Sequence, residues 1–467
     1  MYKTITEQDV FGNITAADLG NGTSETASYS NKNGQMLLKA VAKGSNNLMN
    51  ISYQGYDGFG NLTHVDVTTG NVGIDQHQFT GTYEYDSLHR LERNLVDNHV
   101  VTSYSYDAVG NLLSKSDYAT QYDYTTGATG GPNAVKRVYR GGWKSFSYDT
   151  RGNMTRGDGL TSAMYNAMDK PTQIKKDGKT LSFTYGPEHM RFKQVNGSVI
   201  TYYSDKLYEE EITGSKTTWR AYIDDIAVIS QTTGEDATIR YTHRDRLGSA
   251  RVFTDHNGQV EAERNFDPFG KPRLASGGLK SFGNAKLNDL EDAKTRRGFT
   301  DHEHLDDVEL IHMNGRVYDY NLGRYMSVDP VIQSPTNSQS INPYSYIMNN
   351  PLSGTDPTGY TAECNDSGVC DIGNIKMDDV ENVQVTKDGN MVVNTKDGNS
   401  YQVESINGAD AKGAFTSAYN VGKSPDIMSQ SNINKSSPTP SGGQSSGGCG
   451  GLLVQVLLFA VYYLRLL

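Results

Sequence analysis

Apolar and polar residues alternate along much of the first 240 residues, and short polar turns interrupt the alternation. Clear cases are the triplets YEY at 83–85, YSY at 104–106 and FSY at 146–148. A period of two is the pattern of a β-strand with one buried face. Each triplet is followed by Asp, and Gly-Asn pairs at 60–61, 110–111 and 152–153 supply turn residues. The pattern predicts an all-β fold made of antiparallel hairpins.

The hairpins repeat. Copies of one heptad are YDGFGNL at Tyr56, YDSLHRL at Tyr85, YDAVGNL at Tyr106 and YDTRGNM at Tyr148, with degenerate forms YNAMDKP at Tyr165 and DVFGNI at Asp9. In each unit we expect the Asp carboxylate to bond the following backbone amides while Gly adopts a positive φ. In YDAVGNLLSKSD the predicted hairpin runs from Tyr104 through Gly110 into Leu112, leaving Lys and Ser on the exposed face.

A single hairpin is marginally stable in water, so repeated hairpins must pair with their neighbours into a continuous sheet. The alternative is a loop-rich globule of independent hairpins. The composition favours many short strands with tight turns, because the 467 residues include 49 Gly and 30 Tyr.

Charge and cysteine content exclude some classes of protein. The net charge is -11, with 43 Lys and Arg against 54 Asp and Glu, and no long basic run is present, so the repeat region should not bind nucleic acid. Three cysteines cannot form a disulfide scaffold. The N-terminal residues show no basic segment followed by an apolar stretch, so no signal peptide is visible.

The repeats resemble the Tyr-Asp repeats of the Rhs family, and residues 241–360 resemble the Rhs repeat-associated core domain. The core resemblance rests on an ordered series of motifs: YTHRDRLGS at 241–249, NFDPFG at 265–270, RGFT at 297–300 with His302 and Glu303, LIHMNGRVYD at 310–319, LGRYMSVDP at 322–330, NPYSY at 342–346, NNP at 349–351 and DPTGY at 356–360. With the repeats, the resemblance covers about three quarters of the chain.

The resemblance implies a long β-sheet coiled into a hollow shell, with the core domain sealing one end. It divides the chain into a repeat region at 1–240, a core domain at 241–360 and a variable C-terminal segment at 361–423. Family members carry unrelated segments after this boundary, often toxins held inside the shell. A Gly/Ser-rich linker at 424–451 and an apolar tail at 452–467 follow.

The resemblance also implies self-cleavage after the DPTGY motif, between Tyr360 and Thr361, by a pair of core aspartates. Two carboxylates held close share a proton, so one acts as acid while the other activates water. Asp329 occupies the matching Ser-Val-Asp-Pro position. The second family acid falls near Gln339 or Ser340, where no acid is present, so Asp319 and Asp356 are the substitutes. The structural alternative is that these Asp residues only start turns. If the aspartates are catalytic, the enzymatic activity is at most that of a single-turnover aspartyl autoprotease.

Other candidate residues carry weaker signals. His302, His304 and His312 lie among acids, but their spacing matches no helical zinc motif, so we expect no metal and no cofactor. Cys364 and Cys370 either close a small disulfide loop or remain unpaired thiols.

The C-terminal segment itself resembles nothing that we can name. Short strands at 383–386, 391–394 and 401–403, separated by Lys-Asp-Gly-Asn turns, predict a three-stranded meander. The apolar tail at 452–467 is short for a membrane span; it fits a membrane-inserting tail, a sorting tail or an element packed inside the shell.

The function predicted from the sequence is a shell for a bacterial polymorphic toxin or contact-dependent competition protein. Its tyrosines would line the interior around the C-terminal segment as cargo. The expected partners are that segment, an immunity protein, secretion-system components and a membrane through 452–467, and the expected location is secreted or at the bacterial cell surface. The alternative is a cell-surface adhesion or carbohydrate-binding repeat protein with a C-terminal anchor.

Overall fold

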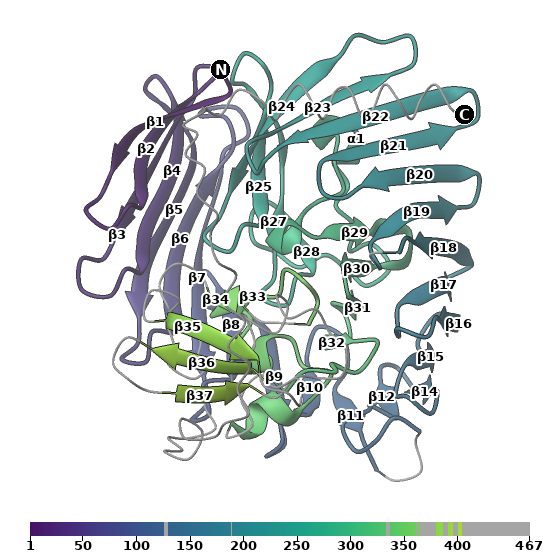
Figure 1. The fold of residues 1–467 in the computed structure, drawn as a ribbon. Coiled ribbons are helices and arrows are strands. Elements are labelled where there is room, and N and C mark those ends of the chain that lie inside the picture. Colours follow the sequence, from purple (N-terminus) through teal and green to yellow (C-terminus); the bar gives the residue numbers. More distant parts are fainter. Residues whose placement is uncertain are drawn as a thin grey trace.

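The computed structural model of the chain describes residues 1–125, 129–187, 189–332 and 337–360, together with four short strands of the C-terminal segment. Almost all of its secondary structure is antiparallel β-sheet, as the alternating pattern predicts. Two large sheets, which we call the first wall and the second wall, face each other across the molecule (Figure 1).

The first wall has ten strands in chain order, each paired with its sequence neighbour. They are β1 (Lys3–Gln8), β2 (Ile14–Leu19), β3 (Ser24–Tyr29), β4 (Met36–Lys43), β5 (Asn46–Tyr56), β6 (Leu62–Thr69), β7 (His77–Tyr85), β8 (Leu91–Val96), β9 (His99–Tyr106) and β10 (Leu112–Lys115). This order is that of hairpins joined into one sheet, which rules out the globule of independent hairpins.

The second wall has eleven strands, also in chain order. They are β16 (Leu160–Tyr165), β17 (Pro171–Lys176), β18 (Lys179–Tyr185), β19 (Arg191–Asn196), β20 (Val199–Ser204), β21 (Tyr208–Thr213), β22 (Lys216–Ile223), β23 (Ala227–Thr232), β24 (Thr238–Arg244), β25 (Ala250–Thr254) and β26 (Val260–Glu263). Two small sheets join the walls, formed by β11 (Gln121–Asp123), β12 (Arg137–Tyr139) and β13 (Trp143–Ser145), and by β14 (Ser147–Tyr148) and β15 (Met154–Arg156).

The free ends of the two walls meet, so the band of strands returns to its start. Asn21, after β2, donates to the Thr254 hydroxyl of β25 at 2.8 Å, and Glu25 of β3 lies 3.3 Å from the His243 ring of β24. Residue 241, the expected start of the core domain, lies inside β24, so the wall and the core motifs share a strand.

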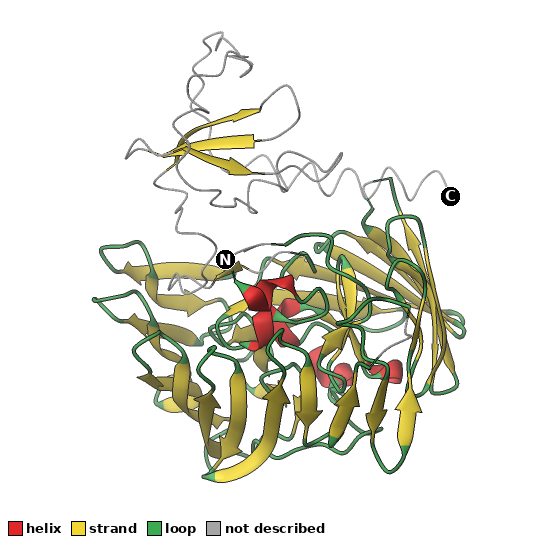
Figure 2. Ribbon diagram, turned by 90° about the horizontal axis from the view of Figure 1, so that it is seen from below, coloured by secondary structure: helices red, strands yellow, loops and turns green. Residues whose placement is uncertain are grey.

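The described residues of 265–360, here called the core region, occupy the space between the walls (Figures 1 and 2). They form β27 (Asn265–Phe266), β28 (Pro272–Arg273), β29 (Glu303–Leu305), β30 (Leu310–Met313), β31 (Arg316–Asp319), β32 (Arg324–Tyr325), β33 (Gly354–Thr355), the helix α1 (Leu290–Ala293) and the 3-10 turns η1 (Phe299–Asp301), η2 (Asp306–Val308), η3 (Ser338–Ile341) and η4 (Ile347–Asn349). One buried apolar cluster joins Leu91 of the first wall, Leu181 of the second wall and Ile311 of the core region.

The repeat turns have the predicted chemistry. Asp107 accepts from the amides of Val109 at 3.0 Å and Asn111 at 2.9 Å, and the Asn111 side chain donates to its second oxygen at 2.9 Å. Gly110 between them has φ of 81°. The same three bonds recur at Asp9, Asp57 and Asp149.

The repeat tyrosines join consecutive repeats. The Tyr85 hydroxyl donates to the Leu62 carbonyl at 2.8 Å, and that of Tyr106 donates to Leu91 at 2.8 Å. Tyr165 of β16 makes the equivalent bond to Met154 of the joining sheet, and Tyr185 of β18 makes it to Pro171 of β17. Tyr185 therefore heads a further repeat, although its sequence lacks the Tyr-Asp pair. These hydroxyl groups therefore hold the wall together.

The predicted hairpin through Gly110 is present, with Leu112 of β10 opposite Tyr106 of β9. The prediction that Lys115 lies on its exposed face is wrong. Lys115 is fully buried rather than exposed, and its ammonium lies 2.6 Å from a carboxylate oxygen of Asp117. Lys271 of the core region reaches the other oxygen of that carboxylate at 2.9 Å. The polar position is thus explained by ionic partners that the alternation pattern does not show.

The C-terminal meander is confirmed as a three-stranded sheet of β35 (Val380–Val385), β36 (Met391–Thr395) and β37 (Ser400–Val403). Of the predicted cysteine pair, Cys364 lies in β34 (Glu363–Cys364) and Cys370 falls outside the described residues, as do the linker at 424–451 and the apolar tail at 452–467. Within the described part of the chain, no helix is long and apolar enough to cross a membrane.

Candidate functional site

The candidate site is built on the hairpin of β30 and β31. Both strands are completely buried, and Met313 pairs with Arg316, so only Asn314 and Gly315 form the turn. Asn314 takes a positive φ of 56°, a conformation that Asn tolerates better than most residues. This tight turn fixes the position of the Arg316 Cα, from which the side chain extends.

Arg316 brings two of the predicted aspartates together. Its Nη2 lies 2.8 Å from Asp329 Oδ2 and 3.2 Å from Asp356 Oδ2, so a single nitrogen holds both carboxylates. Its Nη1 donates to the Pro343 carbonyl at 3.2 Å, and its Nε donates to the Gly359 carbonyl. The arginine side chain is only 2% exposed, which makes these contacts strong because water does not compete with them.

The two carboxylates differ in their surroundings. Asp356 accepts a second hydrogen bond from the Tyr325 hydroxyl at 2.7 Å. Asp329 accepts from the Val331 amide at 2.9 Å, and burial raises the pKa of its carboxyl to about 7 in spite of the nearby Arg316 charge. An acid of this pKa carries a proton in much of the population near neutral pH, whereas Asp356 receives two donors. Asp329 can therefore act as a proton donor, and Asp356 is held by the same Arg316 nitrogen.

The DPTGY segment lies across the turn of this hairpin. The Gly315 amide donates to the Thr358 carbonyl at 2.8 Å, and Arg316 bonds the next carbonyl, that of Gly359. The chain before the predicted cut thus contacts the same residue that holds Asp329 and Asp356. Thr361, on the other side of that bond, falls outside the described residues.

The other predicted positions lie in different contacts. Asp319 accepts from the Leu322 amide at 2.9 Å, and burial raises its pKa, with Lys176 opposing this effect. Gln339, where a second family acid was expected, packs against the wall and donates to the Ala108 carbonyl at 3.2 Å. Arg316 belongs to the LIHMNGRVYD motif, but the sequence alone did not indicate that this residue bridges the two aspartates. The available signal is the Arg at the start of a short strand, RVYD, that directly follows an Asn-Gly turn.

The three histidines of the core region are buried, and burial favours their neutral forms. His304 accepts from the Phe299 amide at 3.1 Å, and His302 lies 2.9 Å from the Thr300 hydroxyl. Burial lowers the pKa of His302, His304 and His312. Among the residues that the structure describes, no group of three or more His, Cys, Asp or Glu side chains could hold a metal ion.

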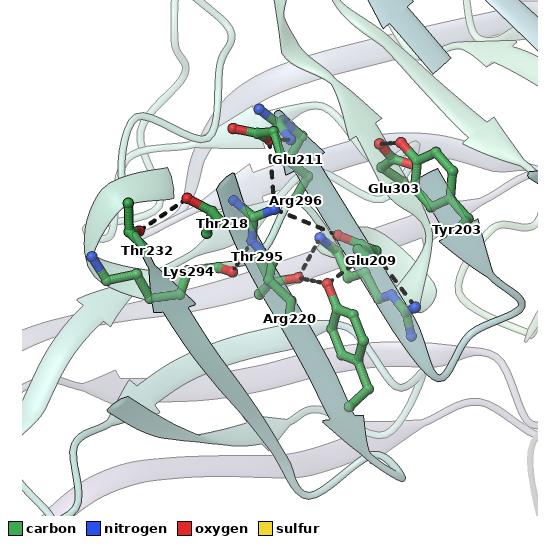
Figure 3. Close-up of polar contacts among 12 residues, drawn as sticks. Tyr203, Glu209, Glu211, Thr218, Arg220, Thr232, Lys294, Thr295, Arg296 and Glu303 are labelled. Atoms are coloured by element: carbon green, nitrogen blue, oxygen red, sulfur yellow. Dashed lines mark hydrogen bonds and ion pairs between the residues drawn. The ribbon is translucent and has the colours of Figure 1, made fainter. Parts of the chain in front are cut away.

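A polar seam fastens the core region to the second wall (Figure 3). Arg296 donates to Glu211 of β21 at 2.6 Å, and Tyr203 of β20 donates to Glu303 of β29 at 2.9 Å. Arg220 of β22 donates to the Lys294 carbonyl at 2.7 Å. These contacts position β29 and, through its pairing with β30, the hairpin that carries Arg316.

Comparison with known proteins places the chain in a family. The Teneurin YD-shell family matches residues 12–352. Curated relatives include the tRNA3(Ser)-specific nuclease WapA of Bacillus spizizenii, 26% identical over 285 residues, and the tRNA nuclease WapA of Bacillus subtilis strain 168, 26% identical over 287 residues. Each alignment covers 59% of this chain but only 12% of the relative, so the chain spans a small part of those proteins.

Solved structures show the same architecture. The Photorhabdus luminescens Tc holotoxin pore matches with a TM-score of 0.60 at 17% identity, over 79% of this chain and 20% of that chain. The TcdB2-TccC3-Cdc42 structure matches with a TM-score of 0.59 at 18% identity, over 76% of this chain and 19% of that chain. The family match, the Tyr-Asp turns and this fold agree, and the chain belongs to the Teneurin YD-shell family.

Proposed function

We propose that the chain is the shell-forming part of a bacterial Rhs-type toxin and that it cuts itself once, after Tyr360, to free its C-terminal segment. The observation that carries this proposal is the joint grip of Arg316 on Asp329, Asp356 and the Gly359 carbonyl. The names of the WapA nucleases and of the Tc holotoxin support a toxin context.

The cleavage is hydrolysis of one peptide bond. Asp356, held by Arg316 and Tyr325, accepts a proton from a water molecule, whose oxygen attacks the Tyr360 carbonyl carbon. Asp329, with a pKa of about 7, supplies a proton to the departing Thr361 nitrogen. The water is divided between a new carboxyl group on Tyr360 and a new amino group on Thr361. The reaction happens once because the chain is its own substrate.

Containment depends on the walls. The hydroxyl groups of the repeat tyrosines donate hydrogen bonds to neighbouring repeats. Their role is therefore to stiffen the wall rather than to offer hydrogen bonds to cargo. The segment after Tyr360 would be the cargo, with an immunity protein and secretion-system components as further partners. The expected location is secreted or at the cell surface of a bacterium, and the tail at 452–467 would supply membrane contact.

The intact mass of the purified full-length chain tests this function. The wild type should yield a fragment that begins at Thr361, and both Asp329→Asn and Asp356→Asn should remain whole. Asp319→Asn is the matched control, because this buried acid of the same hairpin lies in different contacts and should cleave as the wild type does. A wild-type chain that stays whole would overturn self-cleavage and favour the anchored adhesion protein.

A further inference from the structure

The Tyr360 side chain is seated on the turn between β30 and β31. Its hydroxyl donates to the Gly315 carbonyl at 3.0 Å, and its ring lies against the Gly315 Cα. A Cβ built on Gly315 would overlap this ring, coming within 2.6 Å of Tyr360 Cζ and 2.7 Å of the Thr358 carbonyl. Gly315 therefore leaves a space for the Tyr360 ring that any side chain at position 315 would fill. We call this space the Gly315 pocket.

The residues before Tyr360 are held one after another by the same turn. The Asn314 side chain donates to the Pro357 carbonyl at 2.7 Å, and the Gly315 amide donates to the Thr358 carbonyl at 2.8 Å. Arg316 bonds the Gly359 carbonyl. Three consecutive residues, Asn314 and Gly315 of the turn and Arg316 of β31, thus contact three consecutive carbonyls, which fixes the position of the segment along the site.

Gly359 allows this close approach. Its φ is 77°, and a Cβ there would overlap the Met313 carbonyl and lie 2.9 Å from the Arg316 amide. The backbone of the segment therefore lies directly on the hairpin backbone. Tyr360 is the next residue of the segment, and its ring lies against Gly315. The Arg316 guanidinium carbon lies 5.8 Å from the centre of the Tyr360 ring, a distance that favours a flat aromatic ring in the pocket.

We infer that the β30–β31 turn is the substrate-reading element of the site, and that Gly315 forms a pocket selecting an aromatic residue immediately before the bond to be cut. This inference rests on the proposed self-cleavage. Gly315 and Asn314 are positioning residues, because they hold the segment and do not touch the reacting atoms. The preferred segment is one with Gly at position 359 and Tyr or Phe at position 360.

The chemistry of the pocket sets the expected specificity. Tyr360→Phe keeps the ring and loses one hydrogen bond, so the cleavage rate should stay within about threefold of the wild type. Tyr360→Val replaces a flat ring by a branched side chain without a π face, and the rate should fall at least about tenfold. Gly315→Ala should reduce the rate by a similar or larger factor, because Cβ displaces both the ring and the Thr358 carbonyl.

The first experiment measures the rate and the fragment mass for the full-length variants. The matched control for Gly315→Ala is Gly58→Ala, an exposed glycine of the first wall where a Cβ would meet nothing within 4 Å. Slow cleavage in Gly315→Ala and Tyr360→Val, with normal rates in Gly58→Ala and Tyr360→Phe, is the expected result. Equal rates in all four variants, with the fragment still starting at Thr361, would overturn the inference.

The second experiment separates the pocket from the chemistry. In an Asp329→Asn background, chymotrypsin should cut after Tyr360 slowly when the ring is seated and at least about tenfold faster when Gly315→Ala displaces it. Unchanged protection in the double variant, with a native melting temperature, would contradict the pocket. Because this assay needs no self-cleavage, it decides the pocket even if the wild type proves uncut. If Gly315→Ala does not fold, Gly359→Ala in the same background gives the answer, because it keeps Tyr360 as the chymotrypsin site and its Cβ would overlap the Met313 carbonyl.

Discussion

In the walls the aspartates of the repeat turns bond within their own turns, whereas in the core region two aspartates far apart in the sequence meet on one arginine. Asp107 finds its donors within four residues. Asp329 and Asp356 depend on Arg316, which also holds two backbone carbonyls. Damage to a wall turn should therefore stay local, while loss of Arg316 should disable the whole site.

The largest effect is expected from Arg316→Leu. The change leaves two buried carboxylates without their cation, so the free energy of unfolding should fall by about 3–5 kcal/mol and cleavage should stop. Urea unfolding and the intact mass measure these two effects. Arg93→Leu is the control, because its contact with Glu84 is exposed and its loss should cost less than about 1 kcal/mol. Equal losses in the two variants would contradict the special role of Arg316.

The pH dependence is the next largest effect. The pKa of Asp329 is raised to about 7, so the folded chain keeps a proton that the unfolded chain releases near its ordinary value of 3.8. Stability from this group is present at low pH and is lost as the pH rises toward 7, with a slope of at most about 1.4 kcal/mol per unit. Unfolding curves from pH 4 to 8 should show this loss in the wild type and a flatter profile in Asp329→Asn.

The cleavage rate should depend on the protonation of the same Asp329 carboxyl. Above pH 7 the donor form of Asp329 is depleted, and the rate should decline up to about tenfold for each further pH unit. A rate that keeps rising to pH 9 would remove Asp329 from the role of acid.

A wall turn should give a smaller effect. Asp107→Ala removes three hydrogen bonds from a turn whose Gly110 carbonyl also accepts from Arg324 at 2.8 Å, so we expect a loss of about 2 kcal/mol. Asp9→Ala removes the same three bonds from an exposed turn and should cost less. Thermal unfolding compares them; a loss of cleavage in Asp107→Ala with an unchanged melting temperature would contradict the local role of the turn.

The smallest effect is expected from Tyr106→Phe, which removes the hydrogen bond to the Leu91 carbonyl and keeps the ring. The cost should be about 1 kcal/mol, measured by thermal unfolding. Tyr139→Phe is the control, since this tyrosine is 42% exposed. A wall tyrosine whose change alters cargo release but not stability would restore the idea of a hydrogen-bonding lining.

The wall could be predicted from the sequence because its determinants are local. The Asp-to-Asn spacing of one turn contains the donors and acceptors of the three hydrogen bonds that the Asp carboxylate accepts. Lys115 is the exception. The alternation of its neighbours places it on the exposed face, but it is buried with Asp117 and Lys271. The local sequence does not indicate this contact, because Lys271 belongs to the core region.

The candidate site could be predicted only in part. The motif resemblance located Asp329 and the Asp356–Tyr360 segment, but the sequence left Asp319 and Asp356 as equal substitutes. Their difference lies in contacts with Arg316 and Tyr325, which no local pattern specifies. The Gly315 pocket was missed for the same reason, because a glycine next to Asn reads as an ordinary turn residue until the Tyr360 ring is placed on it.

The most direct test of the account is the time course of cleavage when the denatured full-length chain is refolded at several concentrations. The account predicts a fragment that begins at Thr361 and appears with a first-order rate independent of concentration, in the wild type but not in Asp329→Asn. No fragment in the wild type, or the same fragment in Asp329→Asn, would contradict the claim that the Arg316 site cuts its own chain.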